Sequence, residues 1–200
     1  MRLYHVPATR SIRVLWALEE AEAPFELTVL QPEERRGEEH LARHPLGRVP
    51  VIEDDEGFVF ESGALCLHVA DSYPDARLIG PPGSHERALV YQWVLFASTE
   101  LESNFVDFMG SRGADPVRAD AARERFRAAA AVLERALDGH EYLVGDRFTV
   151  ADVMCGELLG VCKRHELTEG MSNIAAYVER LDNRPARTRA EAVGRPRLDD

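Results

Sequence analysis

The chain has 200 residues and a formal net charge of −11, from 35 acidic and 24 basic side chains. Its length is sufficient for one large or two small domains with a buried core. The acidic balance argues against nucleic-acid binding, which needs concentrated lysine and arginine, but it does not exclude a small anionic ligand held by a few local donors.

The first part of the chain alternates short strands with helices. Arg2 to His5 has a strand pattern, and apolar residues recur at helical spacing from Ser11 to Glu22. Pro24 marks a break before a second strand over 25–30. The polar stretch 31–44 is predicted to be a loop with a short, mobile helix.

A β-hairpin follows this loop. Its strands are Val49 to Ile52 and Phe58 to Phe60, on either side of a charged turn. Leu65, Val69 and Tyr73 then recur with the spacing of a helix. The predicted order β-α-β-α-β-β-α indicates an α/β domain over residues 1–75.

The remainder of the chain has helical patterns only. Residues 76–84 are rich in proline and glycine and are predicted to be a linker. Residues 85–200 are predicted to form an all-helical bundle. Within this bundle, Thr149 to Asp152 has the pattern of a capping box, so we assign Asp152 a structural role and not a catalytic one.

The compartment is predicted to be the cytoplasm. The sequence enters a strand pattern without a charged-then-apolar leader, and no apolar run approaches the length of a membrane span. Cys66, Cys155 and Cys162 lie in apolar helical patterns without C-x-x-C spacing, which is typical of reduced core thiols.

Five segments, in order, resemble the cytosolic glutathione S-transferase superfamily, in its bacterial type and without a clear class. They are Leu3 to Glu20, the run APFEL from Ala23, His44 to Leu65, Tyr142 to Val153, and the run from Tyr177. The resemblance covers nearly the whole chain. It implies a thioredoxin-like N-terminal domain that binds glutathione, followed by an all-α C-terminal domain that contributes the pocket for an electrophile.

The resemblance also implies a glutathione site. The bond between Val49 and Pro50 is expected to be cis, which turns the backbone of Val49 toward the cysteinyl unit of an extended peptide. Glu61 and Ser62 are expected to bind the γ-glutamyl end, with Ser62 as N-cap of the next helix, because a helix N-terminus attracts a carboxylate. Arg48 is expected to meet the glycyl carboxylate. Each of these expectations has a structural alternative. Pro50 could be a trans proline at an edge strand, Ser62 could simply cap the helix with Glu61 solvated, and Arg48 could be a solvated side chain without a ligand.

The group that activates the thiol is open. Familiar classes place a serine, tyrosine or cysteine near the start of the first helix. Alignment on Arg13-Val14 brings Thr9 to the serine position of some members, and alignment on Pro7 brings Arg10 to the cysteine position, with Ser11 beside it. Thr9, Arg10 and Ser11 are therefore the catalytic candidates. Helix capping by Thr9 or Ser11, with Arg10 solvated, is the structural alternative.

The function implied is that of a detoxifying glutathione transferase, which activates glutathione as a thiolate and conjugates it to small hydrophobic electrophiles. The alternatives are a glutathione-dependent isomerase or dehalogenase, and a non-catalytic binding or regulatory protein. Glutathione is the co-substrate, no metal, nucleic acid or membrane is expected, and a homodimer is implied by resemblance. Candidates to line the second pocket, expected between the domains, are Phe105, Phe108, Met109 and Cys162. The structural alternative, which is the expectation for most of these residues, is that they belong to the core.

Overall fold

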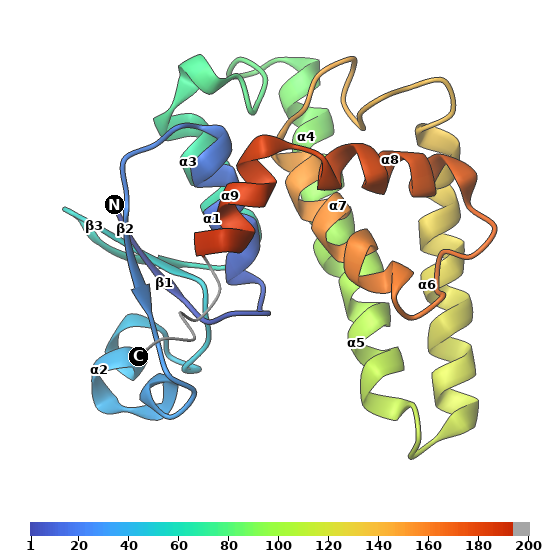
Figure 1. The fold of residues 1–200 in the computed structure, drawn as a ribbon, viewed down its shortest axis with the longest axis horizontal. Coiled ribbons are helices and arrows are strands. Elements are labelled where there is room, and N and C mark those ends of the chain that lie inside the picture. The colour runs from blue at the N-terminus through green and yellow to red at the C-terminus, as the bar shows by residue number, and fades with distance from the viewer. Residues whose placement is uncertain (194–200) are drawn as a thin grey trace. The chain divides into compact units, whose positions relative to one another are not determined.

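The computed structural model of the protein describes residues 1–193 (Figure 1). Contacts divide the chain into two compact units, one formed by Met1–Leu78 and the segment that begins at Asn183, the other by Ile79–Asp182. The first unit contains a mixed sheet with helices and the second is helical. These features confirm the predicted fold class.

The sheet of the first unit has four short strands in the order β2-β1-β3-β4. They are β1 (Arg2–His5), β2 (Glu26–Val29), β3 (Val51–Asp54) and β4 (Gly57–Phe60). β1 runs parallel to β2 and antiparallel to β3, which in turn is antiparallel to β4. The end of β1, the start of β3 and the end of β4 therefore lie at the same edge of the sheet.

The helical elements of the first unit are α1 (Ser11–Glu20), η1 (Glu34–Arg36), α2 (Glu38–Arg43), α3 (Ser62–Ser72), η2 (Pro74–Ala76) and α9 (Pro185–Val193). α1 packs against α3 and α9. It can do so because one continuous run, from Arg13 to Leu18, is buried. Among the described residues, the order of strands and helices up to α3 agrees with the sequence pattern.

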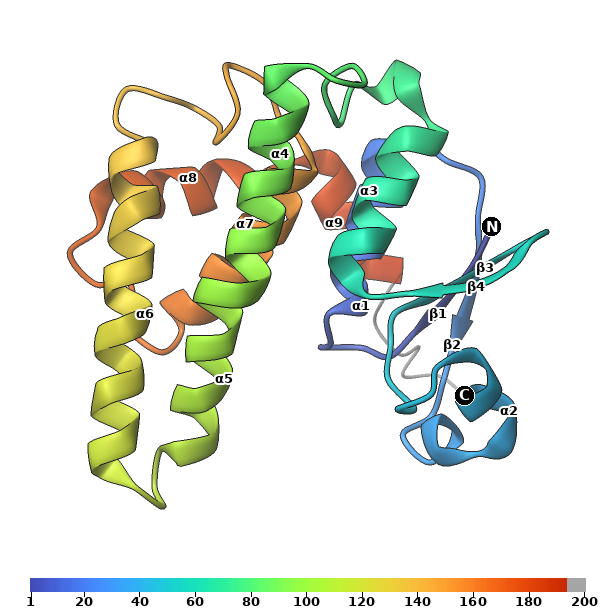
Figure 2. The same cartoon turned by 180° about the vertical axis from the view of Figure 1, so that it is seen from behind.

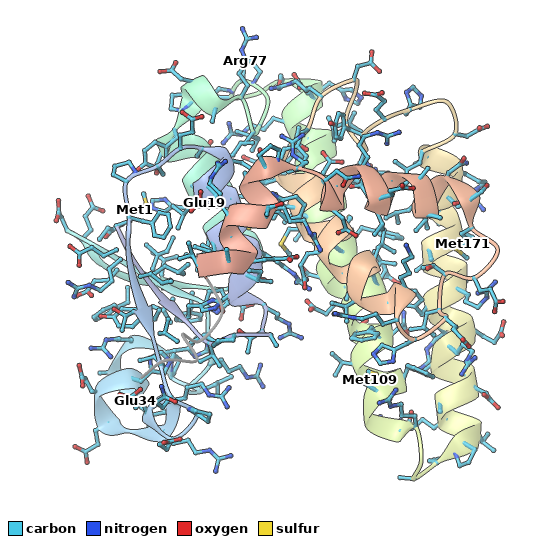
Figure 3. The ribbon with its side chains drawn as sticks, viewed as in Figure 1. Met1, Glu19, Glu34, Arg77, Met109 and Met171 are labelled. Carbon is cyan, nitrogen blue, oxygen red and sulfur yellow. The ribbon has the colours of Figure 1, made fainter. Side chains whose placement is uncertain are left out.

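Helix α9 belongs to the first unit, although it is last in the chain. Arg184, just before α9, donates to both carboxylate oxygens of Glu20 at 2.6 and 2.7 Å. Arg189 donates to Glu19 of α1 at 2.7 Å, and Glu19 is labelled in Figure 3. The Arg187 guanidinium lies 4.8 Å from the centre of the Trp16 ring. This grouping differs from the predicted helical domain of 85–200, because ion pairs and stacking join α9 to α1.

The second unit begins with a long, interrupted helix. α4 (His85–Phe96) continues through a π-helical turn, η3 (Ala97–Leu101), into α5 (Glu102–Ser111), as Figure 2 shows. The other helices are α6 (Pro116–Ala136), α7 (Val150–Lys163) and α8 (Ser172–Asp182). None of the helices described in residues 1–193 is long and apolar enough to cross a membrane.

The capping box predicted at the start of α7 is confirmed. The Thr149 N–H donates to Oδ2 of Asp152 at 2.8 Å, and the Ala151 N–H donates to the Thr149 hydroxyl at 3.3 Å. Oδ1 of Asp152 accepts from the Leu143 N–H at 3.0 Å and from the Tyr177 hydroxyl at 2.8 Å. Asp152 therefore fixes a loop, a helix start and α8 at one buried point.

Candidate functional site

The segment between β1 and α1 contains the three candidate activating residues. Ala8, in its turn, has φ of 58°, which is unusual for a residue with a side chain. The N-cap of α1 is Arg10, and no side chain caps this helix. The structural alternative, in which Thr9 or Ser11 is the N-cap, is therefore wrong, because the backbone carbonyls of Thr9 and Arg10 accept the first helical hydrogen bonds, both at 3.1 Å.

The three candidates differ in their access to a ligand. Arg10 is exposed and Thr9 is half-buried, whereas Ser11 is inaccessible to solvent. The Thr9 hydroxyl lies 2.7 Å from the Val6 carbonyl oxygen and 2.7 Å from the Ser11 hydroxyl. Burial excludes direct contact between Ser11 and a ligand in this conformation, and leaves Thr9 and Arg10 within reach of one.

The loop before β3 presents the second group of site residues. The Val49–Pro50 peptide bond is cis, which confirms the expectation for this pair. Among the described residues, no hydrogen bond outside the regular ladders involves the N–H or C=O of Val49. The side chain of Val49 packs in a cluster with Tyr4, Val6, Leu30 and Val51. Val49 lies two residues before β3, and its backbone N–H and C=O can pair there with an extended peptide.

Helix α2 supports this loop. His40 on α2 is buried, and its Nε2–H donates to the carbonyl oxygen of Arg48 at 2.9 Å. The side chain of Arg48 is exposed. The loop therefore combines a fixed backbone with an accessible guanidinium, a suitable partner for a carboxylate.

The turn between β4 and α3 provides the third group. Glu61 is exposed and has φ of 79°, and its carbonyl accepts the first helical bond, from the Leu65 N–H at 2.9 Å. Glu61 is the N-cap, and Ser62 is the first residue of α3. The expectation that Ser62 caps this helix is therefore wrong, because the helical bonds begin one residue earlier. The N–H groups of the first turn precede the first intrahelical donor, so they can bind an anion.

His44 is a neighbour of these groups that the sequence patterns did not single out. Its ring lies 4.6 Å from the ring of Phe60, and its Nδ1 accepts from the Leu46 N–H at 3.1 Å. Burial lowers the pKa of His44, and the nearby Glu61 carboxylate partly opposes this effect. His44 therefore lies within electrostatic range of Glu61 and Arg48. The signal available in the sequence was only its place before Pro45.

The sheet brings these three groups together. Tyr4 pairs with Val51, and Val51 pairs with Phe60. The residues one step further along, at the end of β1, the start of β3 and the end of β4, share one edge. The first unit thus collects a helix N-terminus, the backbone of Val49, the Arg48 guanidinium and the corner formed by Thr9, Arg10 and Ser11. Together these groups could bind a short peptide that carries charge at both ends.

The residues expected to line the second pocket are placed differently. Phe105 and Met109 on α5 are half-buried, whereas Phe108 is 5% exposed and Cys162 on α7 is fully buried. The Arg123 guanidinium lies 5.2 Å from the Phe108 ring. Cys162 is therefore a core residue of the second unit and is corrected as a pocket candidate. Phe108 is largely buried, but it lines a cavity of the second unit together with Arg112 and His165. All three cysteines are buried thiols, and residues 1–193 contain no cluster of three or more metal-ligating side chains.

Comparison with known proteins identifies the family. Residues 1–71 match the model of the glutathione S-transferase N-terminal domain, and residues 116–198 match that of the C-terminal domain. Glutathione S-transferase GstA of Escherichia coli O157:H7 is 29% identical, over 92% of this chain and 94% of its own. Glutathione S-transferase 4 of Zea mays is 31% identical, over 87% and 83%. The chain belongs to the glutathione S-transferase family.

A solved structure supports the same assignment. A sphingomonad glutathione S-transferase, complexed with glutathione, has a TM-score of 0.88 and 27% identity, covering 97% of this chain and 98% of its own. The predicted family and its enzyme class, glutathione transferase, are confirmed. Elongation factor 1-gamma of Prunus avium is also 30% identical over 74% of this chain, which spans 36% of that longer protein.

Proposed function

We propose that the protein binds glutathione at the sheet edge described above, lowers the pKa of its thiol and transfers the thiolate to electrophilic small molecules. The observation that carries this proposal is the convergence of Val49, Arg48 and the first turn of α3 on the edge where β1 leads into α1. Glutathione has a peptide backbone between two charged ends, which matches this order of groups.

The binding pose follows from these groups. The cysteinyl unit pairs with the backbone of Val49, as an added strand would. The γ-glutamyl carboxylate accepts from the N–H groups at the start of α3 and from the Ser62 hydroxyl, and Glu61 accepts from the ammonium group of the same γ-glutamyl unit. Arg48 meets the glycyl carboxylate. This pose places the thiol toward the corner of Thr9, Arg10 and Ser11.

Activation of the thiol needs more than a helix end. A cysteine thiol has an ordinary pKa of about 8.5, and a decrease of roughly two units requires about 2.7 kcal/mol. A helix N-terminus contributes about 0.3–1 kcal/mol, whereas a hydrogen bond to a charged acceptor contributes about 1.5–3 kcal/mol. One donor from the corner is therefore required, and the exposure of Thr9 and Arg10 favours these two over Ser11.

Isomerisation or dehalogenation would use the same thiolate and would differ only in the second pocket. A non-catalytic role has two observations in its favour: the Thr9 hydroxyl is already hydrogen-bonded to Val6, and part of elongation factor 1-gamma is similar to this chain. A cytoplasmic location and a homodimer are further parts of the proposal, taken from the family resemblance.

The test is retention on immobilised glutathione together with turnover of an aryl halide. A transferase does both, whereas a binding protein is retained without turnover. An isomerase or dehalogenase is retained and acts on a halogenated or isomerisable substrate in preference to the aryl halide. If the folded protein passed through the immobilised glutathione without being retained, the proposed site would be contradicted.

A further inference from the structure

Three polar side chains form a continuous line from the core to the candidate site. His5, at the end of β1, and Ser11, the first residue of α1, are both inaccessible to solvent. Nδ1 of His5 lies 2.8 Å from the Ser11 hydroxyl, which lies 2.7 Å from the half-buried Thr9 hydroxyl. Thr9 then lies 2.7 Å from the carbonyl oxygen of Val6.

The number of protons determines how these three contacts are shared. A hydroxyl has one proton to donate, and a carbonyl oxygen can only accept. The Thr9 proton is therefore directed to Val6, so the contact between Thr9 and Ser11 requires the Ser11 proton. Ser11 then has none left, and the contact at His5 requires a proton on Nδ1. The Ser11 hydroxyl also lies 3.2 Å from the Val6 carbonyl oxygen and accepts from the Val6 N–H at 3.3 Å. Only the arrangement above places a proton in each of the three shorter contacts.

We infer that His5 is a positioning residue for thiol activation. By carrying a proton on Nδ1, His5 donates to Ser11, and Ser11 in turn donates to Thr9. The Thr9 proton is then not needed within this chain and can be donated to a bound thiolate. This inference rests on the proposed function. When the ligand binds, rotation about the Cβ–Oγ1 bond turns the Thr9 proton from the Val6 carbonyl to the sulfur. No covalent bond is broken in this step.

The opposite arrangement would make the corner a weaker donor. If Nδ1 of His5 were bare, the Ser11 proton would turn to it, and Ser11 would then accept from Thr9. Turning the Thr9 proton to the sulfur would then leave the contacts of Thr9 to both Ser11 and Val6 without a proton, whereas the inferred arrangement loses only the one to Val6. In the inferred arrangement, Thr9 accepts from the Ser11 hydroxyl and, at 3.4 Å, from the Ser11 N–H. Accepting these bonds polarises the Thr9 O–H and strengthens it as a donor.

The direct test measures the tautomer of His5 in the wild-type protein without ligand. NMR correlation of the ring nitrogens with the ring protons, in protein labelled with ¹⁵N-histidine, distinguishes the two tautomers. The signals are assigned by their loss in His5→Phe, or by sequential assignment if that variant does not fold. A proton on Nδ1 is expected, in either the neutral or the doubly protonated ring. A bare Nδ1 overturns the inference.

A kinetic test uses variants with matched shape. His5→Phe removes both ring nitrogens, and we expect kcat to fall about tenfold and the pKa of bound thiol to rise by about one unit. The KM for glutathione should stay within about twofold, because the groups that bind its ends are elsewhere. His5→Asn should restore part of the loss, since its amide can donate at the position of Nδ1. His85→Phe, at an exposed residue of α4, is the control.

The outcomes separate the inference from the proposed function. Normal kcat and thiol pKa in His5→Phe, or a bare Nδ1 with normal turnover, would overturn the role of His5 while the transferase proposal stands. Absence of glutathione turnover in the wild type would remove the transferase proposal, although the tautomer could still be measured. If kcat and thermal stability fell together and His5→Asn gave no rescue, His5 would be a structural residue only.

Discussion

The Tyr177 hydroxyl donates a hydrogen bond of 2.8 Å to Oδ1 of Asp152, and the exposed fractions of the two residues are 1% and 0%. Burial raises the pKa of both groups, and the Asp152 charge raises that of Tyr177 further. This pair joins α7 to α8 within the second unit. It gives Asp152 a structural role.

Asp152→Ala should lower the free energy of unfolding by about 3 kcal/mol or more. Two backbone N–H groups and the Tyr177 hydroxyl would lose their buried acceptor, at about 1–3 kcal/mol each. Denaturant unfolding measures the loss, with Asp146→Ala in the neighbouring exposed loop as control. Glutathione affinity in the folded fraction should be unchanged. Unaltered stability together with lost turnover would make Asp152 catalytic.

The attachment of α9 to α1 predicts unequal effects of two arginines. Only 8% of the Glu20 side chain is exposed, and it also accepts from Nε1 of Trp16 at 2.8 Å. Arg184→Ala would leave that carboxylate without its cation, so we expect a loss of about 1–3 kcal/mol. Arg189→Ala should cost less than about 1 kcal/mol, because half of the Arg189 side chain is exposed (50%). Equal thermal shifts in the two variants would disprove this ranking.

Acidification should destabilise the protein through His44. Its folded pKa is lowered by burial, so the unfolded chain takes up a proton first. The stability that neutral His44 contributes is complete above its ordinary pKa of about 6.5 and is lost as the pH falls through the folded pKa. His44→Asn keeps an acceptor for the Leu46 N–H and does not titrate, so this variant should lose less stability. His140→Asn, in an exposed loop, should follow the wild type.

Glu61→Ala and Ser62→Ala should each weaken glutathione binding without unfolding the protein. A charge-assisted hydrogen bond contributes about 1.5–3 kcal/mol, which corresponds to roughly ten- to a hundredfold in Kd. Isothermal titration calorimetry measures the change, with Glu56→Ala at the exposed tip of the hairpin as control. An unchanged Kd in both variants would remove this turn from the binding site.

Much of the fold was predictable because its signals are local. The capping box at Thr149 and the proline after Val49 each act within four residues, and hydrophobic spacing located the strands and helices. Long-range contacts had no such signal. The attachment of α9 through Arg184 and Glu20 joins positions 164 residues apart.

The proposed binding residues follow the family pattern and could be named from the sequence, whereas the arrangement of Thr9, Ser11 and His5 could not. The left-handed conformation of Ala8 brings Ser11 back to His5, and an alanine gives no indication of it. Glu61 likewise has a positive φ and is the N-cap of α3, one residue before the serine that the pattern favours for this role.

The central claim is that the Thr9 corner activates bound glutathione, and thiolate absorbance against pH, at saturating glutathione, tests it most directly. The account predicts a depressed thiol pKa in the wild type and in Thr9→Ser. The pKa should rise by about one to two units in Thr9→Ala, less in Ser11→Ala, and little in Arg10→Ala. A rise confined to Arg10→Ala would make the guanidinium the donor, and wild-type titration in all of these variants would contradict the account.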